Sequence, residues 1–367
     1  MQIYWFSGRS LEDLCATTQI SLASGLIERG YDLTFVNPDP EGSHADWPWR
    51  HQSISSLTAP GFRSRSLGKN MRKWFEQLQI ENDAIALIDW RVANYVVPLF
   101  QKRNMKWILI DRSPPADKGI LSLLQWPSWK KSWKQVHQNT IAHGCVVSSM
   151  HREFVHQKSG THPSKISILP AGVNLELFKP DTSFPVLTMV YHGQLDQHRG
   201  VLALPMLLQK MNSSGLDARL ILIGSGDCFK RLERVAAENE NIDVYSTLEQ
   251  IDLARILSQC HIGLLPMPKN KMWTLASPLK RSEYAASGLL MFGINHHGHR
   301  FPDGASPNWM RLVEQYDFHE EGVKWFQNFD KIEIENLRKQ VRKYAEEKLS
   351  WSHSIDVLEQ AIIALQD

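Results

Sequence analysis

Long apolar runs and paired cysteines are both missing from this sequence of 367 residues. A membrane-spanning helix needs about 18 consecutive apolar residues, and no segment approaches that length. The four cysteines, Cys15, Cys145, Cys228 and Cys260, stand singly, which argues against a disulfide framework and a zinc site. The first residues, MQIYWFSGRS, lack the basic and apolar regions of a signal peptide. We therefore expect a reduced, cytoplasmic protein.

Several catalytic motifs are missing as well. No Gly-x-Gly-x-x-Gly follows the first expected strand, which argues against a nicotinamide or flavin enzyme. Ser148-Ser149 lacks the Gly-x-Ser-x-Gly elbow of a hydrolase. Neither His-Glu-x-x-His nor Asp-x-Asp accompanies the histidines of residues 296–299, so we expect a polar loop there and no metal site. The cations from Arg63 to Lys73 fit no nucleic-acid-binding module, and we expect no nucleic-acid partner.

The composition is that of a globular protein with about two domains. Hydrophobic residues make up 43% of the chain and charged residues 22%, and roughly 150 residues per domain gives two. Residues 1–180 hold 21 Lys and Arg against 15 Asp and Glu, whereas the remainder holds 20 against 24. The first half therefore favours an anionic partner.

Short apolar runs alternate with helical stretches, which predicts an α/β fold with parallel sheets. The expected strands are Gln2–Phe6, Tyr31–Val36, Ala84–Ile88, Lys106–Ile110, Gly144–Ser148, Val186–Tyr191, Ala218–Ile223, Ile242–Val244, Ile262–Leu265 and Leu290–Phe292. The alternation restarts after a proline-punctuated stretch from Pro170 to Pro185, which indicates two Rossmann-like halves.

Four segments of the second half resemble a known family. They are Lys165–Pro180 (KISILPAGVNLELFKP), Tyr191–Gly200 (YHGQLDQHRG), Leu220–Asp227 (LILIGSGD) and Ser277–Gly288 (SPLKRSEYAASG). In this order they are similar to the inter-domain segment, the two glycine-containing strand ends and the donor-binding helix of GT-B glycosyltransferases of family 4, the glycosyl transferase group 1 type. The resemblance covers about residues 140–365 well, and the first part of the chain matches only in architecture.

The resemblance implies two Rossmann-like domains that face each other across a cleft. Residues 1–175 would bind the acceptor, and residues 176–350 would bind a nucleotide sugar. Residues 351–367 would form a C-terminal helix that packs back on the first domain. No cofactor is expected, because the nucleoside diphosphate sugar is a substrate.

The residue types in these segments suit a diphosphate. Glycines permit close backbone approach, and a helix that begins beside a phosphate supplies N–H donors. The candidate donor-binding residues are Gly8, Gly193, Gln194, Gly224, Gly226, Ser277, Pro278 and Glu283. Ser277 is expected to be the N-cap of a helix on which Lys280 meets phosphate and Glu283 accepts from the ribose hydroxyls.

The candidate catalytic residues are Asp111, Arg199 and Lys280. Arg199 and Lys280 would stabilise charge on the departing diphosphate. At the expected donor and reacting sites, three positions depart from the family's pattern: Gln194 stands where an arginine is usual, Leu275 replaces a glutamate, and Asp111 replaces a histidine near the reacting sugar.

These features predict sugar transfer from a nucleoside diphosphate sugar, with retention implied by the resemblance. Two alternatives stay open: another GT-B enzyme, such as a nucleotide-sugar epimerase or a phosphorylase, and a non-catalytic nucleotide-sugar-binding protein.

Tryptophans and lysines alternate in Gly119–Lys134 (GILSLLQWPSWKKSWK). Trp126, Trp129 and Trp133 would share one side of a helix, a pattern typical of a membrane interface. The basic run Arg63–Lys73 would add attraction to anionic lipid. We therefore predict a lipid-linked or glycan acceptor and peripheral contact with an anionic membrane at its cytoplasmic face, the alternative being tryptophans packed in the core.

Overall fold

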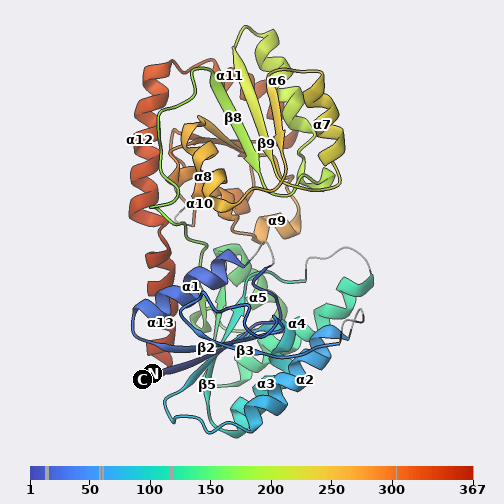
Figure 1. The fold of residues 1–367 in the computed structure, drawn as a ribbon, viewed down its shortest axis with the longest axis vertical. Coiled ribbons are helices and arrows are strands. Elements are labelled where there is room, and N and C mark those ends of the chain that lie inside the picture. The colour runs from blue at the N-terminus through green and yellow to red at the C-terminus, as the bar shows by residue number, and fades with distance from the viewer. Residues whose placement is uncertain (13–15, 58, 60–61, 116–119, 303, 367) are drawn as a thin grey trace. The chain divides into compact units, whose positions relative to one another are not determined.

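The structure is a computed structural model that describes residues 1–12, 16–57, 59, 62–115, 120–302 and 304–366 (Figure 1). The expectations for Cys15 and Gly119 lie outside these residues. The chain forms two compact units. Unit 1 comprises Met1–Pro170 with Trp351–Asp367, and unit 2 comprises Ala171–Ser350.

Unit 1 is built on a parallel sheet, whose strands as described follow the order β3-β2-β1-β4-β5-β6-β7. They are β1 (Gln2–Phe6), β2 (Asp32–Asn37), β3 (Arg50–Ser53), β4 (Ile85–Asp89), β5 (Lys106–Asp111), β6 (Ala142–Val146) and β7 (Ile166–Ile168). Phe6 of β1 pairs with Val36 on one side and Ile88 on the other. The central strands are buried on both faces, because helices cover both sides of a parallel sheet.

The helices of unit 1 include the last helix of the chain. They are α1 (Thr17–Glu28), α2 (Arg63–Glu76), α3 (Trp90–Lys102), α4 (Ile120–Gln138), α5 (Ser149–Ser159) and α13 (Trp351–Gln366). Ile355 and Leu358 of α13 lie in the core of unit 1, and Arg29 bonds Asp356 and Glu359. The C-terminal helix thus returns to the N-terminal unit.

Unit 2 repeats the plan with a parallel sheet in the order β10-β9-β8-β11-β12-β13 across the described strands. They are β8 (Leu187–His192), β9 (Ala218–Ile223), β10 (Ile242–Tyr245), β11 (Ile262–Leu265), β12 (Leu290–Ile294) and β13 (Met310–Val313). Its α-helices are α6 (Ala203–Ser213), α7 (Phe229–Ala237), α8 (Gln250–Gln259), α9 (Lys271–Leu275), α10 (Leu279–Ala286), α11 (Phe318–Phe326) and α12 (Lys331–Lys348). The predicted α/β architecture of two Rossmann-like units is confirmed.

The prediction that three tryptophans face a membrane is wrong for two of them. Trp129 and Trp133 of α4 are fully buried. Their indole N–H groups donate to Oδ2 of Asp111, at 2.6 and 2.8 Å. Trp126 is half-buried and packs edge-on against Trp129. The helix does gather these rings on one side, but that side faces the interior, because a buried carboxylate needs donors there.

Candidate functional site

Two glycines after β8 and β9 hold the chain in conformations that only glycine adopts easily. Gly193 has φ 114° and Gly224 has φ 142°. A Cβ on Gly224 would lie 1.9 Å from the carbonyl oxygen of Gly193, so the two strand ends touch. Gly226 follows in the second of these loops. Both loops leave the carboxyl edge of the sheet, where ligands bind in folds of this kind.

Helix α10 begins beside these loops and carries three buried charged side chains: Arg281, 2% exposed, and Lys280 and Glu283, each 7% exposed. Pro278 is the N-cap, so the prediction that Ser277 caps the helix is wrong. Ser277 precedes the cap, and its hydroxyl accepts from Arg281. Proline donates no N–H and fixes φ near the helical value, which suits a helix start.

Four buried polar atoms near this helix start complete no hydrogen bond with any described residue: Nζ of Lys280, Oε2 of Glu283, Nε2 of His192 and Nε of Arg199. His192 ends β8, and its Nε2 lies 3.1 Å from Oε2 of Glu283. Buried polar groups normally find partners, so a cluster of unsatisfied ones indicates a site built for a ligand.

Lys280 is the most unusual member of this cluster. Its Nζ lies 3.9 Å from the ring centroid of Tyr191, and a Cβ on Gly193 would lie 3.1 Å from the same atom. Burial, followed by the positive charge of Arg199, lowers the pKa of Lys280 to about 7, while Glu283 acts in the opposite direction. An anion beside this amine would supply the missing partner.

Arg199 lies at the end of a short 3₁₀ helix, η2 (Gln197–Arg199). Its guanidinium donates to Oε1 of Gln194 at 3.1 Å, and its Nε lies 3.8 Å from Oδ2 of Asp196. Gln194 therefore adds no charge to the site but orients the arginine that is present.

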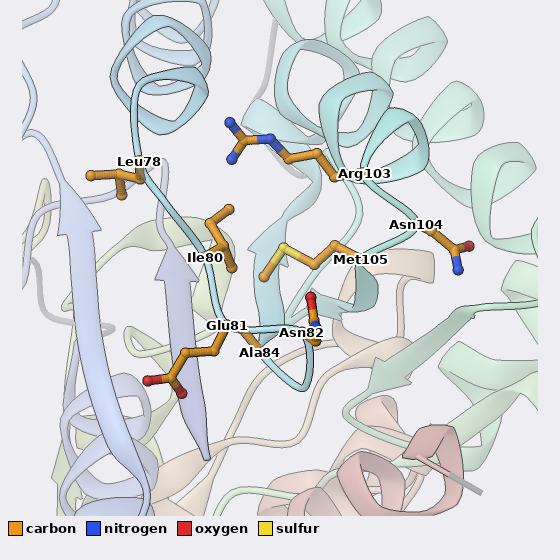
Figure 2. A pocket seen from close by; sticks show the side chains of 8 residues that line it. All are labelled: Leu78, Ile80, Glu81, Asn82, Ala84, Arg103, Asn104 and Met105. Atoms are coloured by element: carbon orange, nitrogen blue, oxygen red, sulfur yellow. The ribbon is translucent and has the colours of Figure 1, made fainter.

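A pocket of about 330 Å³ lies in unit 1 (Figure 2). It opens between the segments that enter β4 and β5, lined by Leu78, Ile80, Glu81, Asn82, Ala84, Arg103, Asn104 and Met105. Arg103 already donates to the carbonyl oxygens of Phe75 and Glu76. The pocket lies at the amino edge of the sheet, opposite the edge where ligands bind in parallel α/β sheets.

No protein-family model matches the chain, and no curated protein sequence matches it. Solved structures match over its whole length. A glycosyltransferase from Rickettsia africae ESF-5 has a TM-score of 0.77 at 12% identity, covering 100% of this chain and 98% of that one. Sucrose-phosphate synthase from Thermosynechococcus elongatus has a TM-score of 0.75 at 14% identity, and the match covers 99% of this chain and 98% of that one. HepE from Anabaena, solved with UDP-glucose, has a TM-score of 0.71 at 9% identity, and the match covers 100% of this chain and 99% of that one. The chain has the GT-B fold.

The expected site residues of this GT-B protein fall in both units. Gly193, Gln194, Arg199, Gly224, Gly226, Ser277, Pro278, Lys280 and Glu283 belong to unit 2, and Gly8 and Asp111 belong to unit 1. In unit 2, His192 and Trp273 join the candidate site without having been predicted. His192 could have been found from the sequence, because it is the last residue of a strand at the carboxyl edge of the sheet. Trp273 is recognised only from its contact with Arg199 in the folded chain.

Asp111 ends β5 and is fully buried. Its carboxylate accepts from the indoles of Trp129 and Trp133, and Nε2 of His151 lies 3.3 Å from Oδ2. Burial alone would raise the pKa of Asp111, but His151 and the two indoles lower it overall. Its catalytic role stays a prediction, and the contacts that the structure shows are structural.

Gly8 lies in the loop after β1, where a Cβ would come within 3.0 Å of Cβ of Arg91. Arg91 is paired with Asp89, the N-cap of α3. The loop is therefore packed against the ends of two neighbouring elements, and its expected role in ligand approach stays a prediction.

The histidines of residues 296–299 form a packed loop. Nε2 of His296 bonds the carbonyl of Met267, and Nδ1 of His299 bonds the carbonyl of Ile294. Burial lowers the pKa of His296 to about 4 and that of His299 well below its usual value. Within the described parts of the chain, no group of three or more His, Cys, Asp or Glu is placed to hold a metal ion.

Proposed function

We propose that this protein is a glycosyltransferase that moves a sugar from a nucleoside diphosphate sugar to an acceptor. The observation that carries the proposal is the buried Nζ of Lys280, which has no hydrogen-bond partner among the described residues, beside Glu283 at the start of α10. In this proposal the diphosphate lies next to Lys280 and Arg199, and the ribose diol lies next to Glu283. HepE, which shares the fold, was solved with UDP and with UDP-glucose, so UDP is the first nucleotide to test.

In the proposed reaction the bond between the sugar's anomeric carbon and the diphosphate oxygen breaks while a bond to the acceptor oxygen forms. Arg199 and Lys280 stabilise the negative charge that grows on the departing diphosphate. We propose retention, with the leaving phosphate taking the acceptor's proton on the face from which it departs. The two side-chain cations carry the charge stabilisation, so no cofactor enters the proposal.

The direct test is binding followed by turnover. UDP, GDP, ADP and their glucose conjugates are screened by thermal shift, and release of nucleoside diphosphate is then measured with and without candidate acceptors. Release separates an enzyme from a protein that only binds nucleotide sugars. Isomerised sugar would favour an epimerase, and release of a sugar phosphate on adding inorganic phosphate would favour a phosphorylase.

We propose a lipid-linked or glycan acceptor held at an anionic, cytoplasmic membrane face. The support lies in α2, whose buried residues Leu67, Met71 and Phe75 face the core. Its exposed positions carry five cations, Arg63, Arg65, Lys69, Arg72 and Lys73, against a single acid, Glu76, at its last residue. Leu123 and Leu124 of α4 are 65% and 67% exposed, and both helices pack on α3. No helix among the described residues is long and apolar enough to cross a bilayer.

A further inference from the structure

Trp273 contacts the cation that the proposed reaction depends on. It lies in α9, and the guanidinium carbon of Arg199 lies 4.7 Å from the centroid of its ring. An arginine over an indole face is attracted by the ring's negative face, and the attraction grows when water is excluded. Arg199 is half-buried at this point.

Trp273 is itself held in place by contacts of its backbone and of its ring. The backbone N–H of Trp273 donates to Oδ1 of Asn270 at 3.0 Å. A Cβ on Gly298 would lie 1.9 Å from the carbonyl oxygen of Trp273, so the loop at η3 (His297–His299) packs tightly on α9. The ring of His198 stacks on the indole with centroids 5.9 Å apart and an interplanar angle of 13°. The backbone of Trp273 is therefore anchored where its ring meets Arg199.

Besides Trp273, Arg199 interacts with its own loop and with the side chain of Tyr191 in β8. Gln194 accepts one N–H and Asp196 attracts the guanidinium, while Nε keeps no hydrogen-bond partner within the described chain. An arginine side chain is flexible, and fixing it before the ligand arrives lowers the entropy cost of binding. Trp273 adds a contact with the guanidinium from a separate element, α9.

We propose that Trp273 is a positioning residue that holds Arg199 in the orientation that meets the donor's diphosphate. The inference rests on the proposed function. Gln194 brings no charge to the site, and holding Arg199 in one orientation would make the nearby charge of Arg199 more effective.

The test is a double-mutant cycle read by calorimetry, using whichever of UDP, GDP and ADP the parent binds. Trp273→Leu should weaken that binding about tenfold, and Trp273→Phe should retain most of the affinity, since a phenyl ring also attracts a cation. In an Arg199→Met background, Trp273→Leu should change affinity less than twofold. Binding of the matching nucleoside, which has no phosphate, should change less than twofold in every variant.

Three other results would each overturn the inference. An equal loss from Trp273→Leu in both backgrounds, or an equal loss from Phe and Leu, would show a purely structural role. A loss of nucleoside affinity would show that the indole contacts the base instead. If the parent binds none of the three diphosphates, the proposed function fails and takes this inference with it. Unfolding temperatures identify a variant that fails to fold, in which case Trp273→Met replaces Trp273→Leu and should weaken binding in the same way.

Discussion

His192 and Glu283 face each other in unit 2, with Nε2 of the histidine 3.1 Å from Oε2 of the carboxylate. They come from different elements, the end of β8 and the second turn of α10. Neither atom completes a well-aligned hydrogen bond with a described residue. A ribose diol can donate to a carboxylate and accept from an imidazole, so this pair matches both functions of one ligand.

The first prediction concerns Glu283. Glu283→Ala should weaken nucleoside diphosphate binding about tenfold or more, because each hydrogen bond to a charged group contributes about 1.5–3 kcal/mol. Glu283→Gln should lose less, since an amide oxygen still accepts. Glu233→Ala, an exposed position on α7, is the matched control. Calorimetric titration gives the affinities, and parent-like binding by Glu283→Ala would remove α10 from the proposed donor site.

The second prediction is a pH dependence set by Lys280. Its folded-state pKa of about 7 lies below the usual value of 10.5, so between these values the unfolded chain holds more protons than the folded one. The free energy of unfolding should therefore rise with pH across that window. Lys280→Met should raise the melting temperature by several degrees below pH 7, and the gain should shrink toward pH 10.

Melting curves of the parent, Lys280→Met and the exposed control Lys210→Met from pH 6 to pH 10 test this prediction. The control should follow the parent at every pH. A constant difference between Lys280→Met and the parent would show that the amine is not the titrating group.

The sequence predicted the sheets well because their strands are apolar runs buried on both faces. Gln2–Phe6 and Ala218–Ile223 have the predicted bounds. It missed β3, whose residues RHQS are polar and only partly buried. It also missed α2, in which cations outnumber the apolar residues of the buried face. Edge strands and charged helices carry a weak pattern because little of their surface is buried.

The sequence indicates candidate site residues where binding a ligand requires a certain residue type at a certain spacing, as for Lys280 and Glu283 on one helix. The contacts between distant segments could not be predicted. Helical spacing places Trp129 and Trp133 on one side, but it does not say whether that side faces solvent or core. The answer depends on Asp111, which is contributed by a different element. Trp273 and Arg199 are likewise neighbours only in the folded chain.

The third prediction concerns Asp111 and separates a structural role from a catalytic one. Asp111→Leu should lower the free energy of unfolding by about 3 kcal/mol or more, because it leaves His151 and two indole donors buried without their acceptor. Asp83→Asn, at an exposed position, should have little effect. Denaturant titration measures both. A variant as stable as the parent but without turnover would return Asp111 to the catalytic residues.

The fourth prediction tests the membrane contact through α2. Reversing Arg65, Lys69 and Arg72 to glutamate should abolish flotation with anionic liposomes, since each cation near such a surface contributes roughly 1 kcal/mol. Reversing Lys230, Arg231 and Arg234 on α7, which are equally exposed, makes the same charge change in unit 2 and should leave flotation intact.

Replacing Leu123 and Leu124 of α4 by serine should reduce the part of liposome binding that survives high salt. Flotation at low and high salt gives the comparison. An equal loss of flotation in the α2 and α7 variants would show that only the net charge of the protein matters, and not the position of α2. If the parent does not float, the acceptor is not held at a membrane.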